Sequence, residues 1–341
     1  MTRSTSEVAR IVGDAAWLAH RFDPEHDAVH FKRVSRDMHR SATFITDEYL
    51  PADAATVVIR RGDAVAAAAP TAPMHFVFHS AYCCSTMLAR AFDIEGAAMG
   101  LKEPVLLNDL IGWKHRGGTA RAIAAVLDDG LTLLARPFAP SEAVVIKPSN
   151  VTNALAPAML TMRPAARALC LYAPLPTYLG SIARKGMWGR LWARDLFVKQ
   201  LADGLIDLGF PSADYLGQTD LQAAALGWLA QHALFARLVA AHGPARVRTL
   251  DSETLVARPA EVMRALGALF GIAIDPEAAA AGPAFTRHSK SGDAFGAAAR
   301  EREADSIGAL DADEIAKVTT WTAAVAASQG IPMTAPAPLL T

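Results

Sequence analysis

The chain has 341 residues, of which 52% are hydrophobic, with 23 glycines and 20 prolines. This length suffices for one large domain or two small ones, and the composition excludes collagen-like, low-complexity and wholly disordered proteins. The 33 basic and 34 acidic side chains leave a net charge of −1. Binding to nucleic acid or to an anionic membrane through an overall positive field is therefore not expected.

The cysteine content and the N-terminus point to the cytoplasm. Cys83, Cys84 and Cys170 are too few for a disulfide framework, which fits a reducing compartment. The first residues, MTRSTSEVARIVGDAAW, contain early acidic residues and no long apolar run, so no secretory signal is expected. No uninterrupted apolar run of about 18 residues occurs, so no membrane span is predicted. A homo-oligomer is left open.

Residues 1–70 form a leading section with its own pattern. Helical periodicity covers residues 8–20, and TVVIRRGDAVAAAA (56–69) suggests two short strands around an Arg-Gly-Asp turn. We expect this section to be an N-terminal extension or a small subdomain packed on the core. Residues 71–341 are expected to form the main domain.

From residue 74, short apolar runs alternate with helical patterns. Strands are predicted at 74–80, 97–104, 142–150, 166–174 and 245–251. Helices are predicted at 85–93, 105–111, 119–135, 152–160, 175–184, 189–208, 219–242 and 258–271. The alternation predicts a three-layer α/β fold with a mainly parallel central sheet flanked by helices. Ligands of such folds bind beyond the carboxyl ends of the strands, which places candidate site loops at 79–86, 102–103, 147–150, 172–181 and Asp251.

The loop after the first of these strands, in HSAYCCSTMLAR (79–90), runs through a tight turn into a helix. The backbone N–H groups of Cys84, Ser85 and Thr86 would lie at the helix N-terminus, where unpaired donors and the helix dipole favour an anion. No Gly-Lys pair of the Walker type GxxxxGK[ST] is present, which argues against a standard ATP or GTP hydrolase. An ordinary strand-to-helix turn is the alternative interpretation.

YCCSTML (82–88) resembles the loop of sulfotransferases, of the type R-S-G-T/S-T-L-L, which holds the 5′-phosphosulfate of 3′-phosphoadenosine 5′-phosphosulfate (PAPS). Tyr82 stands where the family has a basic residue, and Cys84 where it has glycine. The resemblance implies a P-loop NTPase-like fold over residues 71–341, with PAPS as co-substrate and no metal. The implied donor-binding residues are Tyr82, Cys83, Cys84, Ser85 and Thr86. Another cation would have to neutralise the 5′-phosphate.

GLKEP (100–104) carries Lys102 and Glu103 at the end of the second predicted strand. A carboxylate there can be a general base that takes a proton from an acceptor hydroxyl, and Lys102 can supply positive charge to a phosphate or sulfate. A surface Lys-Glu pair is the alternative. In tyrosylprotein sulfotransferases a glutamate at a similar distance from the phosphate loop is the base, and Glu103 is similar in placement.

VVIKPSN (144–150) places Lys147 at the end of the third predicted strand. KPSN resembles the D-K-x-P-x-N segment that the family often carries here. Lys147 would stabilise the bridging oxygen as the leaving phosphate gains charge.

The segment ALCLYAPLPTYLGSIARKG (168–186) lies where sulfotransferases have R-x-P-x-x-x-x-x-S, whose arginine and serine bind the 3′-phosphate. Tyr172 occupies the arginine position, and Ser181 is displaced by one residue. Ser181 with Arg184 or Lys185, one helical turn on, is a candidate substitute anion site. An exposed basic helix face is the alternative.

Two later segments complete the resemblance. RVRTLDSETLVARPAEVMRALGALFGI (246–272) carries an acidic residue and an ALFGI tail, which support the fold rather than the activity. FTRHSKSGDAFGAAARER (285–302) resembles the family's late R-K-G loop over the 3′-phosphate, so Arg287 and Lys290 are candidate donor-binding residues. A charged loop without a binding role is the alternative. The histidines show no metal-ligand spacing, and no HExxH or CxxC pattern occurs.

Together these observations predict a sulfotransferase that moves a sulfuryl group from PAPS to a hydroxyl or amine of a small-molecule acceptor. Glu103 would be the base, and Lys102 or Lys147 would balance the growing charge. A small-molecule kinase or another nucleotide-dependent phosphotransferase stays open, although it would need Mg²⁺ and a phosphate-reaching lysine that the loop lacks. A non-catalytic nucleotide- or anion-binding protein is the second alternative.

Overall fold

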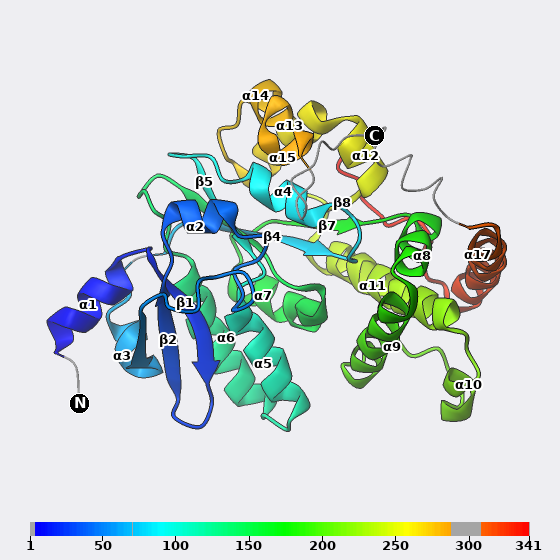
Figure 1. Cartoon of the computed structure of the whole chain (residues 1–341), viewed down its shortest axis with the longest axis horizontal. Coiled ribbons are helices and arrows are strands. Elements are labelled where there is room, and N and C mark those ends of the chain that lie inside the picture. Colours follow the sequence, from blue (N-terminus) through cyan, green and yellow to red (C-terminus); the bar gives the residue numbers. More distant parts are fainter. Residues whose placement is uncertain (1–3, 70, 288–307, 341) are drawn as a thin grey trace. The chain divides into compact units, whose positions relative to one another are not determined.

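We describe the fold from a computed structural model, which places residues 4–69, 71–287 and 308–340 (Figure 1). The chain divides into two compact units. Unit 1 comprises Met1–Phe78, Thr86–Arg167 and Phe270–Ile274, and unit 2 comprises His79–Ser85, Ala168–Leu269 and Asp275–Thr341. The boundary expected at residue 70 stays a prediction.

The N-terminal section contains a three-stranded antiparallel sheet in the order β1-β2-β3. Its elements are α1 (Thr5–Gly13), β1 (Trp17–Asp23), β2 (Ala28–Arg33), α2 (Arg36–Ser41), β3 (Thr56–Arg60) and α3 (Arg61–Ala66). The Ser4 hydroxyl caps α1 by accepting the N–H of Glu7 at 3.3 Å.

Two expectations for this section are wrong. The helix expected over residues 8–20 ends at Gly13, and Trp17 begins a strand instead, because pairing with β2 buries its side chains. The second strand expected after Arg60 is the helix α3. Its first residue, Arg61, is anchored by ion pairs with Asp27 (2.6 Å) and Asp129.

Five strands form the second sheet, in the order β5-β6-β4-β7-β8. They are β4 (Met74–His79), β5 (Ala98–Lys102), β6 (Ala143–Lys147), β7 (Ala168–Tyr172) and β8 (Val247–Asp251). The pairs β4–β6, β5–β6 and β7–β8 are parallel. All residues of β4, β5, β6 and β7 are buried, as is typical of strands covered on both faces. The predicted α/β fold, with a parallel sheet flanked by helices, is confirmed.

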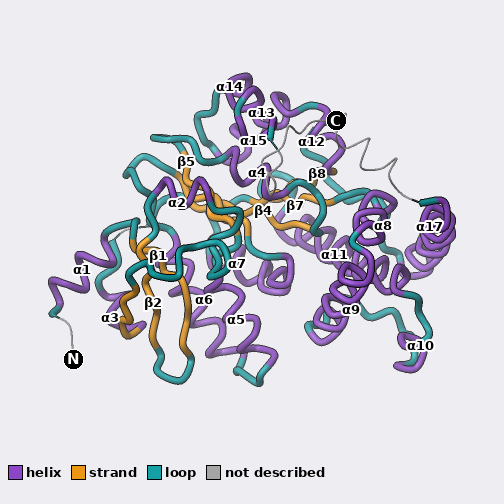
Figure 2. Tube along the Cα trace, in the orientation of Figure 1, coloured by secondary structure: helices purple, strands orange, loops and turns teal. Residues whose placement is uncertain are grey.

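The helices predicted after residue 74 are all present, with small shifts at their ends (Figure 2). They are α4 (Ser85–Ala91), α5 (Val105–His115), α6 (Ala120–Leu134), a 3-10 helix (Asn150–Leu155) that leads into α7 (Ala156–Met162), α8 (Leu175–Arg184), α9 (Gly186–Ala202), α11 (Asp220–His242) and α13 (Pro259–Phe270). The structure adds α10 (Ser212–Leu216), α12 (Ser252–Ala257), α14 (Pro276–Ala281), α15 (Pro283–Thr286) and α17 (Ala309–Gln329).

The helix α11 is a core helix of unit 2. A capping box of Thr219 and Gln222 begins it. Among the described residues it alone is long and apolar enough to cross a membrane, by length and composition only. Because 78% of its apolar window is buried inside the fold, this is weak evidence for a span.

Candidate functional site

The carboxyl ends of β5 and β6 bring Glu103 and Lys147 together. Lys102 and Lys147 are register partners in the parallel pair, so the two strands end side by side. Glu103 then turns sharply, with a φ of +58°, and its N–H donates to the carbonyl oxygen of Lys147 at 2.7 Å. The Lys147 ammonium donates to the Glu103 carboxylate in an ion pair.

The two side chains of this ion pair differ in solvent exposure. The Lys147 side chain is 1% exposed and that of Glu103 is 17% exposed. The Lys147 ammonium nitrogen lies 5.1 Å from the centroid of the Phe44 ring, within the range of a cation–π contact. No local pattern marks Phe44 as a site residue, because only tertiary folding brings residue 44 to residue 147.

The backbone of Glu103 is unusual. A left-handed conformation costs a side-chain-bearing residue about 1–2 kcal/mol, and such conformations cluster at functional sites. Glu103 is thus a partly exposed carboxylate, held by a strained backbone and a buried ammonium. Such a group can accept a proton from a hydroxyl.

The Lys102 ammonium contacts backbone carbonyl oxygens, whereas the Lys147 ammonium contacts a carboxylate. Its ammonium nitrogen lies 2.5 Å from the carbonyl oxygens of His39 and Ala42 and 3.2 Å from that of Arg40. These carbonyls end α2, where helix carbonyls lack intrahelical donors. Burial lowers the pKa of Lys102 to about 7. The contacts favour a structural role for Lys102, in place of the catalytic role that the sequence suggests.

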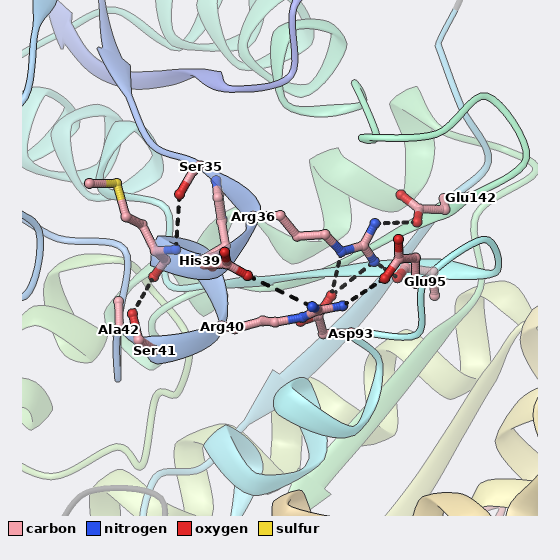
Figure 3. Close-up of polar contacts among 12 residues, drawn as sticks. Ser35, Arg36, His39, Arg40, Ser41, Ala42, Asp93, Glu95 and Glu142 are labelled. Atoms are coloured by element: carbon pink, nitrogen blue, oxygen red, sulfur yellow. Dashed lines mark hydrogen bonds and ion pairs between the residues drawn. The ribbon is translucent and has the colours of Figure 1, made fainter.

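Ion pairs of Arg36 and Arg40 also hold α2 (Figure 3). Arg36 pairs with Glu142 at 2.5 Å and with Asp93 at 3.0 Å, and Arg40 also pairs with Asp93, at 2.6 Å. Burial of Glu142 opposes its ionisation, but hydrogen bonds from Arg36 and from the N–H of Gly96 keep its pKa below the usual value. The start and the end of α2 are therefore both fastened within unit 1.

The phosphate-loop candidate has a constrained backbone. Ala81, Tyr82 and Cys84 have φ values of +75°, +51° and +59°. Ser80 anchors the loop, because its N–H donates to Leu171 and its hydroxyl accepts the N–H of Ala173 at 3.2 Å. A run of left-handed residues is one way in which loops turn backbone N–H groups toward an anion. Of the residues that follow Tyr82, Cys83, Ser85 and Thr86 are buried, and Cys84 is partly buried.

Tyr82, which stands where a basic residue was expected, lies in an aromatic cluster. Its ring centroid is 5.3 Å from that of Trp192 and 5.9 Å from that of Tyr178. Burial raises the pKa of Tyr82 to about 12, so its hydroxyl stays protonated. The ammonium of Lys185 lies 5.9 Å from the Tyr82 ring and 5.4 Å from the Trp188 ring. The Lys185 ammonium therefore lies over the ring of Tyr82.

The second anion-site candidate is also assembled within unit 2. Arg184 donates to the hydroxyl oxygen of Ser181 at 3.2 Å, and this hydroxyl donates to the carbonyl of Thr177. Arg287 is exposed directly after α15, and Lys290 lies outside the described residues. Among residues 4–69, 71–287 and 308–340, no group of His, Cys, Asp or Glu is arranged to hold a metal ion.

No family model matches the chain, and no curated protein matches it significantly. Among solved structures, the chain is similar to a sulfotransferase domain from the curacin biosynthetic pathway, at 14% identity and a TM-score of 0.44, over 78% of this chain and 99% of that one. It is similar to sulfotransferase STF9 from Mycobacterium avium, at 13% identity and a TM-score of 0.41, over 62% and 67% of the two chains. It is also similar to the sulfotransferase domain of the Synechococcus PCC 7002 olefin synthase, at 13% identity and a TM-score of 0.40, over 74% of this chain and 96% of that one. All three are sulfotransferases, the family that the sequence motifs resemble.

Proposed function

We propose that this protein is a sulfotransferase that moves a sulfuryl group from PAPS to a hydroxyl or amine of a small-molecule acceptor. The observation that carries the proposal is the pair of Glu103 and Lys147, a partly exposed carboxylate beside a buried ammonium at adjacent strand ends. The resemblance of YCCSTML to a phosphosulfate-binding loop supports it.

In the proposed reaction, the acceptor oxygen attacks the sulfur atom and forms a new S–O bond. The bond from sulfur to the bridging phosphate oxygen breaks, which releases 3′-phosphoadenosine 5′-phosphate. The acceptor's proton passes to the carboxylate of Glu103. This protonation removes the charge that is paired with Lys147, and an unpaired ammonium in a buried site interacts strongly with new negative charge. Lys147 would then stabilise the leaving phosphate oxygen.

The resemblance to the phosphate-binding segments of sulfotransferases supports the choice of the groups that would hold the donor. The loop around Tyr82 would bind the 5′-phosphosulfate through its N–H groups and the hydroxyl of Ser85, and Lys185 would supply the charge that the loop lacks. Ser181 and Arg184, already in contact, would bind the 3′-phosphate.

Calorimetric titration with 3′-phosphoadenosine 5′-phosphate, with ATP·Mg²⁺ as the comparison ligand, tests the donor site. Glu103→Gln tests the base. We expect the wild type to bind the bisphosphate and Glu103→Gln to bind it equally well. Turnover of Glu103→Gln should fall by about 10²–10⁴-fold, the usual contribution of a general base. Glu25→Gln, at an exposed glutamate of the same unit, is the matched control and should keep full turnover.

Each other result would change the assignment. Preferential binding of ATP·Mg²⁺ would favour the phosphotransferase alternative. Binding without turnover toward any alcohol, phenol or amine would favour the non-catalytic alternative. Full turnover of Glu103→Gln would remove Glu103 as the base.

A further inference from the structure

The segment after α2, residues 42–50, is attached to the end of β5. The N–H of Ile45 donates to the carbonyl oxygen of Lys102 at 2.8 Å, and the Lys102 ammonium donates to the carbonyl of Ala42 at 2.5 Å. The Ile45 side chain is completely buried. These contacts hold the segment next to the residue that follows Lys102 in the chain, which is Glu103.

This segment carries two aromatic rings in contact with each other, and one of them contacts the ion pair. The Phe44 and Tyr49 ring centroids are 5.4 Å apart and the rings are nearly perpendicular, at 85°. Phe44 also contacts the ammonium of Lys147, the ion-pair partner of Glu103. All four residues belong to unit 1.

Of the two aromatic residues, Tyr49 is the more exposed. It is 40% exposed, whereas Phe44 is half-buried. Burial, and after it the charges of Glu48 and Glu103, raise the pKa of Tyr49. A single exposed aromatic ring is ordinary on a protein surface. Here the exposed ring contacts Phe44, and Phe44 contacts the ion-pair partner of a partly exposed carboxylate with a strained backbone.

We propose that Phe44 and Tyr49 form the acceptor-binding surface beside Glu103, and that this surface selects acceptors whose hydroxyl is carried on an aromatic ring. The assignment of the acceptor rests on the proposed function, in which Glu103 is the base. It gives the N-terminal section a role in specificity.

Two physical reasons favour an aryl acceptor. Aromatic rings attract one another at centroid distances of about 4.5–7 Å, in tilted or offset geometries, and Tyr49 exposes a ring to such a partner. A carboxylate is also a weak base, so it deprotonates a phenolic hydroxyl, whose pKa is about 10, more readily than an alkyl hydroxyl.

The test measures binding of 2-naphthol and of cyclohexanol by calorimetry, with 3′-phosphoadenosine 5′-phosphate present. The proteins are the wild type, Tyr49→Ala, Tyr49→Phe and Val58→Ala, the last removing an exposed apolar side chain of β3 in the same unit. We expect Tyr49→Ala to weaken 2-naphthol binding about three- to tenfold, the size of one aromatic contact. Tyr49→Phe and Val58→Ala should bind 2-naphthol as the wild type does, and cyclohexanol should bind weakly to all four.

Equal binding of 2-naphthol by Tyr49→Ala and the wild type would overturn the proposal, as would a wild type that binds the two alcohols equally. A shared urea midpoint of unfolding shows that Tyr49→Ala is folded; if it is not, Tyr49→Leu replaces it, with the same expected loss. Binding is measured without turnover. A wild type that binds 2-naphthol through Tyr49 but transfers no sulfuryl group would therefore refute the proposed function and leave this surface standing.

Discussion

The ammonium of Lys102 lies 2.5 Å from the carbonyl oxygen of Ala42, the residue that caps the end of α2. Lysine is rarely buried without partners, and here the backbone of α2 supplies them. The contact ties the strand that leads to Glu103 to the segment that carries Phe44. The geometry around the carboxylate therefore depends on α2, far from it in the sequence.

Replacing Lys102 tests whether this residue is structural. Lys102→Met leaves buried carbonyls without a donor, so we expect the free energy of unfolding to fall by about 1–3 kcal/mol. Urea unfolding measures the change as a lower midpoint at an unchanged slope. Affinity for 3′-phosphoadenosine 5′-phosphate should stay within about threefold. Lost affinity at unchanged stability would instead support the phosphate-neutralising role that the sequence suggests.

The ion pair of Arg36 with Glu142 should be strongly coupled, because the Glu142 side chain is 0% exposed. Arg36→Met leaves a buried carboxylate without its cation, and we expect a loss of about 3 kcal/mol in unfolding free energy. The double variant Arg36→Met/Glu142→Gln should lose less than the sum of the two single variants, by about 1–3 kcal/mol. Additive losses in urea unfolding would show that the pair is not coupled.

His39 should make stability depend on pH. Burial, with the charges of Lys102 and Arg36, lowers its pKa from 6.5 to about 3 in the folded protein. The unfolded chain therefore binds a proton at His39 as the pH falls below 6.5, while the folded protein does not. Stability is full above this pH and declines below it, by about 1.4 kcal/mol per pH unit for one such group.

The variant His39→Leu has no titrating group at this position. Between about pH 6.5 and about pH 5, its free energy of unfolding should therefore fall by about 2 kcal/mol less than that of the wild type. His75 and His232, whose pKa values burial lowers to about 4 and about 3, are common to both proteins and cancel in the comparison. Urea midpoints at the two pH values provide the measurement. Parallel losses in the two proteins would mean that His39 titrates normally.

Lys185 should contribute to donor affinity because it stands over Tyr82, where the loop lacks a cation. Lys185→Gln should weaken binding of 3′-phosphoadenosine 5′-phosphate about tenfold, and Lys185→Arg should restore most of it. Lys199→Gln is the matched control, since Lys199 is a half-buried lysine of α9 paired with Asp195 at 2.5 Å. The same affinity in both glutamine variants, measured by calorimetry, would exclude Lys185 from the site.

Local patterns were sufficient for the main strands and helices, because buried strands such as Met74–His79 are short apolar runs that stand out in the sequence. They were not sufficient for Trp17–Asp23, whose helical periodicity was overridden by pairing with β2. Within the site, the meeting of Glu103 and Lys147 could be expected, since carboxyl ends of parallel strands share one edge of a sheet.

The sequence by itself determined the α/β class, the five strands and the strand-end positions of Lys102, Glu103 and Lys147, because apolar periodicity and strand ends are local properties of the chain. Only the tertiary structure decided the strand order β5-β6-β4-β7-β8 and the partners of each side chain. In the folded chain, the Lys102 ammonium contacts a carbonyl oxygen at the end of α2, and the Lys147 ammonium contacts the Phe44 ring. Such contacts join residues about 60 to 100 positions apart, and no local pattern records them, because they arise only when burial packs distant segments together.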